Sequence, residues 1–139
     1  MPKLFKLNIL TPEKEFYNNQ AEAVVVQAQD GSLGIYADHA PMVAVLPIGS
    51  LRIKTSEGEW KEAFHTRGFI EVLHNEVLVF VLACEWPEDI DVVRARHALE
   101  EEKEKLRQKQ SINEYKASKI ALARAMGRLR VSQRKNINN

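Results

Sequence analysis

The hydrophobic pattern of the chain changes its period once, close to residue 87. Before this point, short segments rich in Val, Ile, Leu and Phe are separated by turn residues, which is typical of β-strands. Between residues 88 and 134 there is no proline and a single glycine, and the residues that dominate favour helix. Such a chain is expected to fold into a β domain followed by helices.

The first half contains several candidate strands bounded by turn sequences such as QDGS and SEGE. Apolar and polar residues alternate in LRIKT and FIEVL, as in strands with one buried face, whereas VLVFVLA is apolar throughout and is expected to be central. Frequent turns without a helical pattern between them predict a small β-sandwich or barrel. The candidate strands are KLFKLNIL, EAVVVQAQ, SLRIKT, EWKEAFH, GFIEVLH and VLVFVLA.

Apolar residues recur at heptad-like spacing in the second half, which predicts an antiparallel helical hairpin. Ser111, followed by Glu114, predicts a capping box at the start of the second helix. Both apolar stripes are interrupted by a charged residue and are short of large side chains, so the helices should pack weakly. The hairpin is therefore either a plain surface appendage or an element that can adopt another arrangement. The stripes are Val92, Ala95, Leu99 and Leu106, then Ile112, Tyr115, Leu122, Met126 and Leu129.

Arginines are expected to gather at the open end of this hairpin. A turn near residue 110 places Arg94 between Arg124 and Arg128 of the other helix. Guanidinium groups suit phosphate oxygens, and Glu85 and Asp91 could orient them or accept hydrogen bonds from a base or sugar. The sequence has no P-loop, so a nucleotide bound here would be sensed rather than hydrolysed.

Salt bridges within the hairpin, from Asp91 to Arg128 or Arg130, are the alternative to an anion site. A third use of the basic helix RAMGRLRVSQRK is contact with an acidic protein surface or with nucleic acid. The formal net charge of +1 and the lack of an aromatic repeat argue against nucleic acid.

The segment GSLGIYADHAPMV, residues 31–43, places Asp38 beside His39 but offers no nucleophile. The sequence shows no metal-ligand spacing and no hydrolase motif, so we expect neither catalytic residues nor a metal site. We predict a rigid loop that presents Ile35, Tyr36 and His39 as a contact surface, with Pro41 fixing the backbone. Cys84, the single cysteine, is expected to be a small buried residue.

No apolar segment of the sequence is long enough for a signal peptide or a membrane span, which predicts a soluble intracellular protein. The predicted fold class is α+β, mainly β. The predicted divisions are a β-sandwich over residues 1–87, a helical hairpin over 88–134 and a frayed tail over 135–139.

These motifs closely resemble the epsilon subunits of bacterial F-type ATP synthases. GSLGIYADHAPMV is similar to that family's GELGI-x-x-x-HAPL signature, and ALARAMGRLRV resembles the end of its second helix. The likeness runs in order from LNILTPEKEFY to RLRV. The nucleotide-binding motif I/L-D-x-x-R-A is matched by Ile90, Asp91, Arg94 and Ala95.

The resemblance implies a β-sandwich of about ten strands followed by the hairpin. It further implies a non-catalytic subunit of the central stalk, the rotor, which couples proton-driven rotation to ATP synthesis. The partners would be the gamma subunit and the ring of c subunits, with alpha and beta subunits added when the hairpin is extended. Such a protein is peripheral, held at the cytoplasmic face of the cell membrane only through the complex. The implied ring and gamma contacts are Ser32, Leu33, Ile35 and His39, where Ser32 replaces the Glu of many relatives.

The resemblance also implies regulation. A folded hairpin permits turnover in both directions, and an extended one inhibits ATP hydrolysis. No cofactor is required, and ATP is the expected regulatory ligand. Glu101 stands where some ATP-binding relatives carry arginine, which predicts weaker binding. The implied ATP contacts are Glu85, Ile90, Asp91, Arg94, Ala95, Arg124 and Arg128.

If the residues are considered without the family resemblance, the alternative is a free-standing regulatory domain that senses a nucleotide. This alternative predicts a stable monomer without partners, whereas a stalk subunit is expected to be part of a complex.

Overall fold

A computed structural model describes residues 2–108 and 111–138. The chain divides into two compact units, residues 1–85 and 86–139. The first unit is the predicted β-sandwich and the second is the predicted helical hairpin, so the expected fold class, α+β and mainly β, is confirmed.

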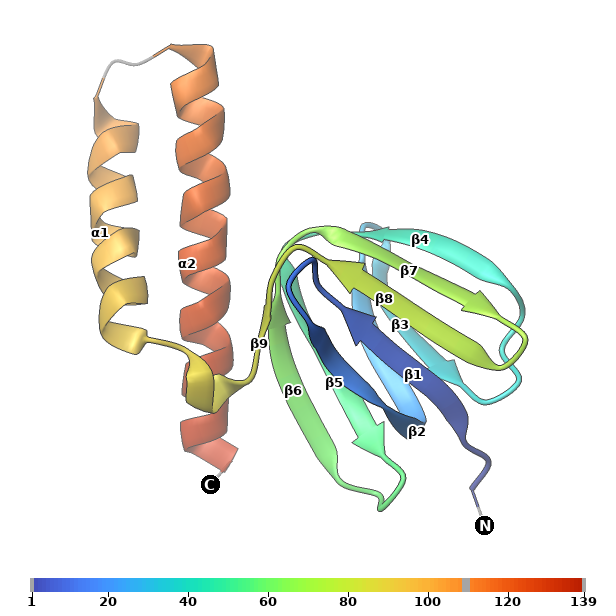
Figure 1. The fold of residues 1–139 in the computed structure, drawn as a ribbon. Helices are drawn as coiled ribbons and strands as arrows, with labels where there is room; N and C mark the ends of the chain where they lie inside the picture. Colours follow the sequence, from blue (N-terminus) through green and yellow to red (C-terminus); the bar gives the residue numbers. More distant parts are fainter. Residues whose placement is uncertain (1, 109–110, 139) are drawn as a thin grey trace. The chain divides into compact units, whose positions relative to one another are not determined.

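Within the described residues the first unit contains nine strands, joined by hydrogen bonds in the order β4-β7-β8-β1-β2-β5-β6-β9, with β3 paired to β2 (Figure 1). All neighbouring strands are antiparallel except β1 and β8. The strands are β1 Phe5–Leu10, β2 Glu15–Ala28, β3 Gly31–Tyr36, β4 Met42–Leu46, β5 Gly49–Thr55, β6 Trp60–His65, β7 Gly68–Leu73, β8 Glu76–Val81 and β9 Cys84–Glu85.

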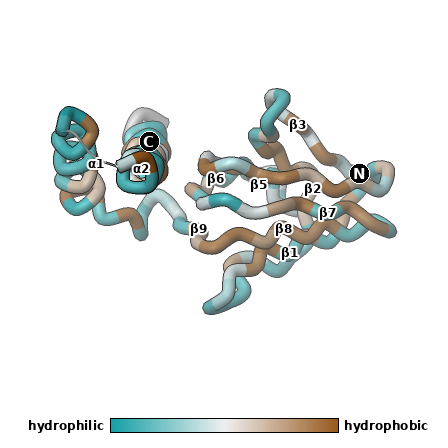
Figure 2. The backbone as a smooth tube through the Cα atoms, turned by 90° about the horizontal axis from the view of Figure 1, so that it is seen from above, coloured by the Kyte–Doolittle hydropathy of each residue, from teal (hydrophilic) through white to brown (hydrophobic). Residues whose placement is uncertain are grey.

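The long strand β2 takes part in both layers of the sandwich and connects them. Its first part pairs with β1, and its second part pairs with β3 and β5. The register against β5 shifts between Ala21 and Ala23, and an irregularity of this kind bends a strand. One layer is therefore β4-β7-β8-β1, the other is β3-β2-β5-β6-β9, and Figure 2 separates them in a view from above.

The core lies between the layers, because alternate residues of each strand point inward. On β8, Val77, Val79 and Val81 are buried while Leu78 and Phe80 are half-buried. The strand is central, as predicted from VLVFVLA, but only one of its faces is fully covered. The fully buried aliphatic residues include Leu7, Ile9, Val24, Val26, Ile35, Leu51, Ile53 and Ile70.

The prediction that residues 31–43 form a loop is wrong for most of the segment. Residues 31–36 form β3, in which Leu33 and Ile35 pair with Val26 and Val24 of β2, and residues 42–46 form β4. Only residues 37–41 connect the two strands. The glycines and the proline hid a short period-2 alternation that pairing with β2 and β7 stabilises.

The second unit begins with a short 3-10 turn, η1 Pro87–Asp89, followed by α1 Val92–Arg107 and α2 Ile112–Asn138. The predicted capping box is confirmed: Ser111 Oγ accepts from the Glu114 N–H at 3.2 Å, and Glu114 Oε2 accepts from the Ser111 N–H at 3.3 Å. Residues 109 and 110 of the predicted turn lie outside the described residues.

The helix stripes are only partly as predicted. Ala95 is the buried residue of α1. On α2, Ile112 and Tyr115 are 73% and 45% exposed, and the buried stripe instead carries small residues such as Ser118 and Ala125. Leu129 of the predicted stripe is 8% exposed and is buried like Val131, so the prediction fails near the start of α2 and holds near its end. α2 continues past Arg134 to Asn138, and Asn139 lies outside the described residues.

Candidate functional site

The residues expected to bind a nucleotide lie mostly at one end of the hairpin. Asp91 and Arg94 stand at the start of α1, and Arg124 and Arg128 are one turn apart on α2. The helices pack antiparallel, so the first turn of α1 lies beside the C-terminal half of α2 (Figure 1). The structure thus brings basic side chains of both helices to the same end.

Asp91 has a structural role in this arrangement. Its Oδ1 accepts a hydrogen bond from the Arg94 backbone N–H at 3.0 Å and caps α1. Within the described part of the chain, Asp91 makes no ion pair, so the alternative of a bridge to Arg128 or Arg130 is not supported. Arg94 and Arg124 are exposed residues, and neither forms an ion pair with residues 2–108 or 111–134.

The remaining predicted nucleotide contacts have different surroundings. Ile90 and Ala95 are 7% and 5% exposed and offer apolar surface. Glu85 belongs to the sandwich unit, on β9, where it lies opposite Phe64 of β6.

Glu101, which departs from the family pattern, is exposed on α1, two turns after Arg94. Its carboxylate is 3.8 Å from His97 Nδ1 and 3.8 Å from Lys105 Nζ, both at i,i+4 spacing. These pairs are solvated, so they hold Glu101 only weakly.

The predicted partner-contact residues divide between surface and core. Ser32 is exposed and its Oγ accepts a hydrogen bond from Gln27 Nε2 at 2.9 Å, and Leu33 is half-buried. Ile35, expected on the surface, is 0% exposed because it pairs with Val24 in the core. It is therefore not a contact residue in this fold, whereas Tyr36 is 60% exposed, as expected.

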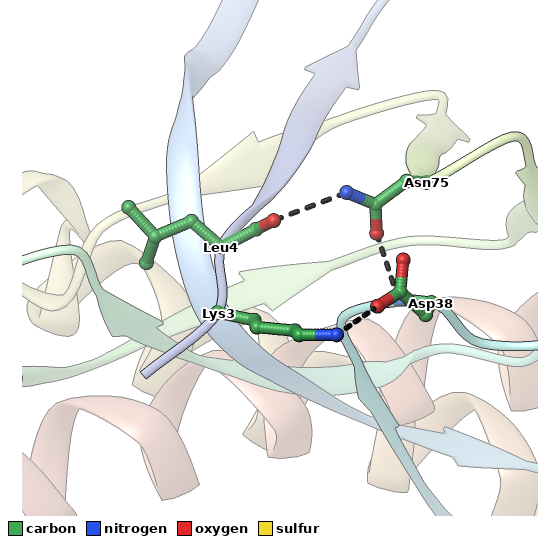
Figure 3. A network of polar contacts seen from close by, with 4 residues as sticks. All are labelled: Lys3, Leu4, Asp38 and Asn75. Atoms are coloured by element: carbon green, nitrogen blue, oxygen red, sulfur yellow. Dashed lines mark hydrogen bonds and ion pairs between the residues drawn. The ribbon is translucent and has the colours of Figure 1, made fainter. Parts of the chain in front are cut away.

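Asp38 and His39 do not form a dyad. The Asp38 carboxylate pairs with Lys3 Nζ at 3.2 Å (Figure 3), and His39 Nδ1 lies 2.8 Å from the Ala40 carbonyl. A carbonyl only accepts, so Nδ1 carries a proton, and in the neutral ring Nε2 is then the acceptor. This arrangement suits a contact surface and lacks the base–nucleophile geometry of a catalytic site.

Sequence reasoning missed an exposed apolar face on the layer β4-β7-β8-β1. Val43 and Val45 of β4 are 70% and 62% exposed, and Phe69 of β7 is 37% exposed. Val45, Phe69 and Phe80 are in register across three strands, and the two rings stack with centroids 5.8 Å apart. The alternation in MVAVL is the signal that would have revealed this face, had residues 42–46 been assigned to a strand.

Two titratable residues of the sandwich, His65 and Cys84, are buried. They face each other across β6 and β9. Burial lowers the pKa of His65, although hydrogen bonds with the Thr66 and Ser50 backbone oppose this, and burial with the nearby Glu85 charge raises the pKa of Cys84 to about 12. A neutral thiol of this kind is unreactive, which confirms the expectation of a buried structural cysteine.

Two kinds of site are absent from the described residues. No helix among them is long and apolar enough to span a membrane. No cluster of three or more His, Cys, Asp or Glu side chains placed to hold a metal occurs among them.

Two family models match the chain in succession. The model of the ATP synthase delta/epsilon chain β-sandwich domain matches residues 4–87, and that of the delta/epsilon chain long α-helix domain matches residues 88–133.

The fold also occurs in mitochondrial assemblies. A chain in the cryo-EM structure of the Euglena gracilis ATP synthase OSCP/F1/c-ring has a TM-score of 0.81 at 20% identity, with 99% of this chain and 83% of that chain covered. A chain in the central stalk/c-ring structure of the Tetrahymena thermophila ATP synthase has a TM-score of 0.66 at 21% identity, with 91% and 95% covered. At this identity the likeness concerns the fold.

Bacterial relatives match over nearly the full length. The ATP synthase epsilon chain of Caldanaerobacter subterraneus subsp. tengcongensis is 44% identical over 135 residues, which cover 96% of this chain and 97% of the relative. That of Ruminiclostridium cellulolyticum is 41% identical over 131 residues, covering 94% and 97%. With both domain models matched in order and these relatives matched end to end, the chain belongs to the family of bacterial F-type ATP synthase epsilon subunits.

Proposed function

We propose that the chain is a non-catalytic subunit of the ATP synthase central stalk, in which the sandwich binds the gamma subunit and the c-ring. The observation that carries this proposal is the succession of the two family domains over residues 4–133. A mitochondrial chain with the same fold comes from a central stalk/c-ring assembly, which supports the same placement.

The exposed apolar face of Val43, Val45 and Phe69 is the proposed contact with gamma. A face of this kind on a sheet is stabilised when a partner covers it, by about 25 cal/mol per Å² of apolar area buried. Exposed apolar side chains that lie in register on neighbouring strands form a continuous patch, which is typical of an interaction surface.

The connection between β3 and β4, with His39 and the neighbouring Ser32, is the proposed contact with the c-ring. Both side chains reach the surface and neither is a carboxylate, so this contact depends on shape and hydrogen bonds. The chain would be held at the cytoplasmic face of the membrane through these partners.

Affinity purification from detergent-solubilised membranes tests this assignment. The tagged wild-type chain should recover alpha, beta, gamma and c subunits together. Val45→Glu should reduce their recovery at least tenfold, because a carboxylate would be buried at the interface. Arg52→Glu, which places a carboxylate on β5 in the other layer, is the matched control and should recover them normally. Recovery of the chain as a monomer would contradict the proposal.

The hairpin is the proposed regulatory element, folded during synthesis and extended toward the alpha and beta subunits when it inhibits ATP hydrolysis. The support is the thin interface: α1 contributes Ala95 as its buried residue, and Ala125 lies in the buried stripe of α2. Two helices that bury little apolar surface separate at low cost in free energy.

ATP is the proposed ligand of the folded hairpin. Arg94, Arg124 and Arg128 share one end of the hairpin, and phosphate oxygens would relieve the repulsion between their charges. Binding to the folded form alone would shift the equilibrium toward it.

Calorimetric titration of the chain with ATP tests the ligand. Heat should be released by the wild type and lost in both Arg94→Ala and Arg128→Ala. Absence of heat from the wild type at millimolar ATP would show that the arginines do not serve nucleotide binding, while the stalk assignment would stand.

A further inference from the structure

The connection between β3 and β4 depends on other parts of the chain for its conformation. It spans residues 37–41 and passes from the edge of one layer to the edge of the other, since β3 pairs with β2 and β4 with β7. A crossing segment of this kind has no ladder hydrogen bonds of its own. Asp38, its second residue, has a φ of 62°, in the left-handed region that non-glycine residues seldom adopt.

One side chain from a different turn reaches this connection. Asn75 lies in the turn between β7 and β8, where His74 and Asn75 have φ values of 52° and 59°, as in a type I′ hairpin. Its Oδ1 accepts a hydrogen bond from the Asp38 backbone N–H at 2.7 Å (Figure 3). Its Nδ2 donates to the Leu4 carbonyl at 3.1 Å.

The two bonds require an amide. The Asp38 N–H is a donor and the Leu4 carbonyl is an acceptor, so the side chain between them must accept at one atom and donate at the other. Aspartate would accept from Asp38 but repel the Leu4 carbonyl. Asparagine also tolerates a positive φ better than other non-glycine residues, so it satisfies the turn and the bridge together.

The bridge joins three segments that are distant in sequence. Leu4 directly precedes β1 and Asn75 directly precedes β8, and these strands are parallel with Lys6 opposite Glu76. The backbone N–H of Lys6 also donates to the Asn75 carbonyl at 3.3 Å. Asp38 is thereby attached to the start of a ladder in the well-packed part of the sandwich.

The nearby ion pair contributes less. Lys3 Nζ lies 3.2 Å from Asp38 Oδ2, but the two side chains are 81% and 61% exposed. Exposed pairs are screened by water and salt, so they restrain a loop only weakly. Asn75 is half-buried and has both of its side-chain polar atoms paired.

We infer that Asn75 is a positioning residue for the partner-contact surface: its amide fixes the connection at residues 37–41 in the conformation that presents His39. In this conformation the Nδ1–H of His39 is bound by the Ala40 carbonyl, and Nε2 is the atom available to a donor on the partner. The inference rests on the proposed function, because it takes this connection as a contact with the rotor.

Asn75→Gly tests the inference in the full chain, because glycine keeps the positive φ and removes both bonds. One readout is amide hydrogen exchange at Asp38 and His39, and the other is affinity for ATP synthase stripped of this subunit. Exchange at Asp38 should become at least tenfold faster, and affinity should fall about tenfold, as expected for two lost hydrogen bonds. Asn75→Asp keeps the acceptor and should give intermediate values.

Thr11→Ala is the matched control. It removes the hydrogen bond from the Lys14 N–H to Thr11 Oγ1, 3.2 Å long, in the turn at the opposite end of β1. Both readouts should stay at wild-type values in this variant.

If the Asp38 amide of Asn75→Gly exchanges as slowly as that of the wild type, the positioning role of Asn75 is overturned. Faster exchange with unchanged affinity would overturn the link between the conformation of the connection and binding. If Asn75→Gly unfolds, Asn75→Asp decides by the same two readouts. Failure of the wild-type chain to bind stripped enzyme would contradict the proposed function instead, and the exchange data would still test the role of Asn75.

Discussion

His65 illustrates how burial determines the properties of single residues in the sandwich. Its side chain is 0% exposed, and Nδ1 is bonded to the Thr66 carbonyl at 2.8 Å. The residues opposite it on the neighbouring strands, Gly49 and Cys84, provide no carboxylate that could pair with a protonated, positively charged imidazole. Protonation would therefore place an unpaired positive charge in the core.

Acidification should destabilise the sandwich through His65. Because burial lowers the pKa in the folded state, the unfolded chain binds the proton more tightly. The free energy of unfolding is thus unaffected by this group above pH 6.5 and falls below it, by at most about 1.4 kcal/mol per pH unit. Urea unfolding between pH 5 and 8 measures this slope. His65→Val should flatten it, and an unchanged slope in the variant would refute the assignment.

The charge at position 101 should set ATP affinity under the proposed function. Glu101→Arg replaces a carboxylate near the proposed phosphate site by a guanidinium and should tighten ATP binding about tenfold, measured by calorimetry. Glu104→Arg, which makes the same change at another exposed position of α1, should bind like the wild type. Equal affinities of wild type and Glu101→Arg would show that residue 101 does not face the phosphates.

The positions of side chains could be predicted from the sequence where helical spacing determines them. Arg94, Arg124 and Arg128 could be placed at one end of the hairpin from helical spacing alone. Ile35 was misplaced because its direction depends on strand register, which the glycines around it concealed. The bridge by Asn75 joins residues far apart in sequence, and no local pattern reveals such a contact.

Among the strands, those with clear alternation were predictable and those at layer edges were not. β3, β4 and β9 are short or glycine-containing, and each is defined by the strand beside it.

Close approach between strands also depends on tertiary context. Gly68 of β7 packs so tightly that an added Cβ would overlap the Phe80 carbonyl oxygen and lie 2.8 Å from Val81 Cα.

Gly68→Ala should therefore lower the free energy of unfolding by about 3 kcal/mol, because backbone atoms cannot move aside as a side chain can. Gly49→Ala is the matched control in β5, where the nearest atom to the added Cβ is the Pro47 carbonyl at 4.0 Å. This variant should stay within about 1 kcal/mol of the wild type. Urea midpoints compare them, and equal midpoints would show that the strands can separate at Gly68.

The capping box should control the stability of α2. Ser111→Ala removes the hydroxyl acceptor of the Glu114 N–H and should destabilise the start of the helix by about 1 kcal/mol. Amide exchange in the first two turns of α2 measures the loss. Ser111→Asp retains an acceptor and should exchange like the wild type, and identical exchange in both variants would mean that the cap is unimportant.

For the whole molecule, the order of the two units was predictable because period and composition change together near residue 87. The apolar face on β4 and β7 could not be predicted from the sequence, because it exists only when two strands far apart in sequence are paired. This face is the strongest structural support for a partner, since its large side chains are in register and exposed.

Photo-cross-linking from this face in intact membranes tests the central claim most directly. Val43, 70% exposed on β4, is replaced by benzoylphenylalanine in a tagged chain, and the adduct formed on irradiation is identified by mass spectrometry. The same replacement at Arg52 of β5 is the control. The account predicts an adduct with the gamma subunit from position 43 and none from position 52. An adduct from position 43 with a protein outside the ATP synthase would contradict it.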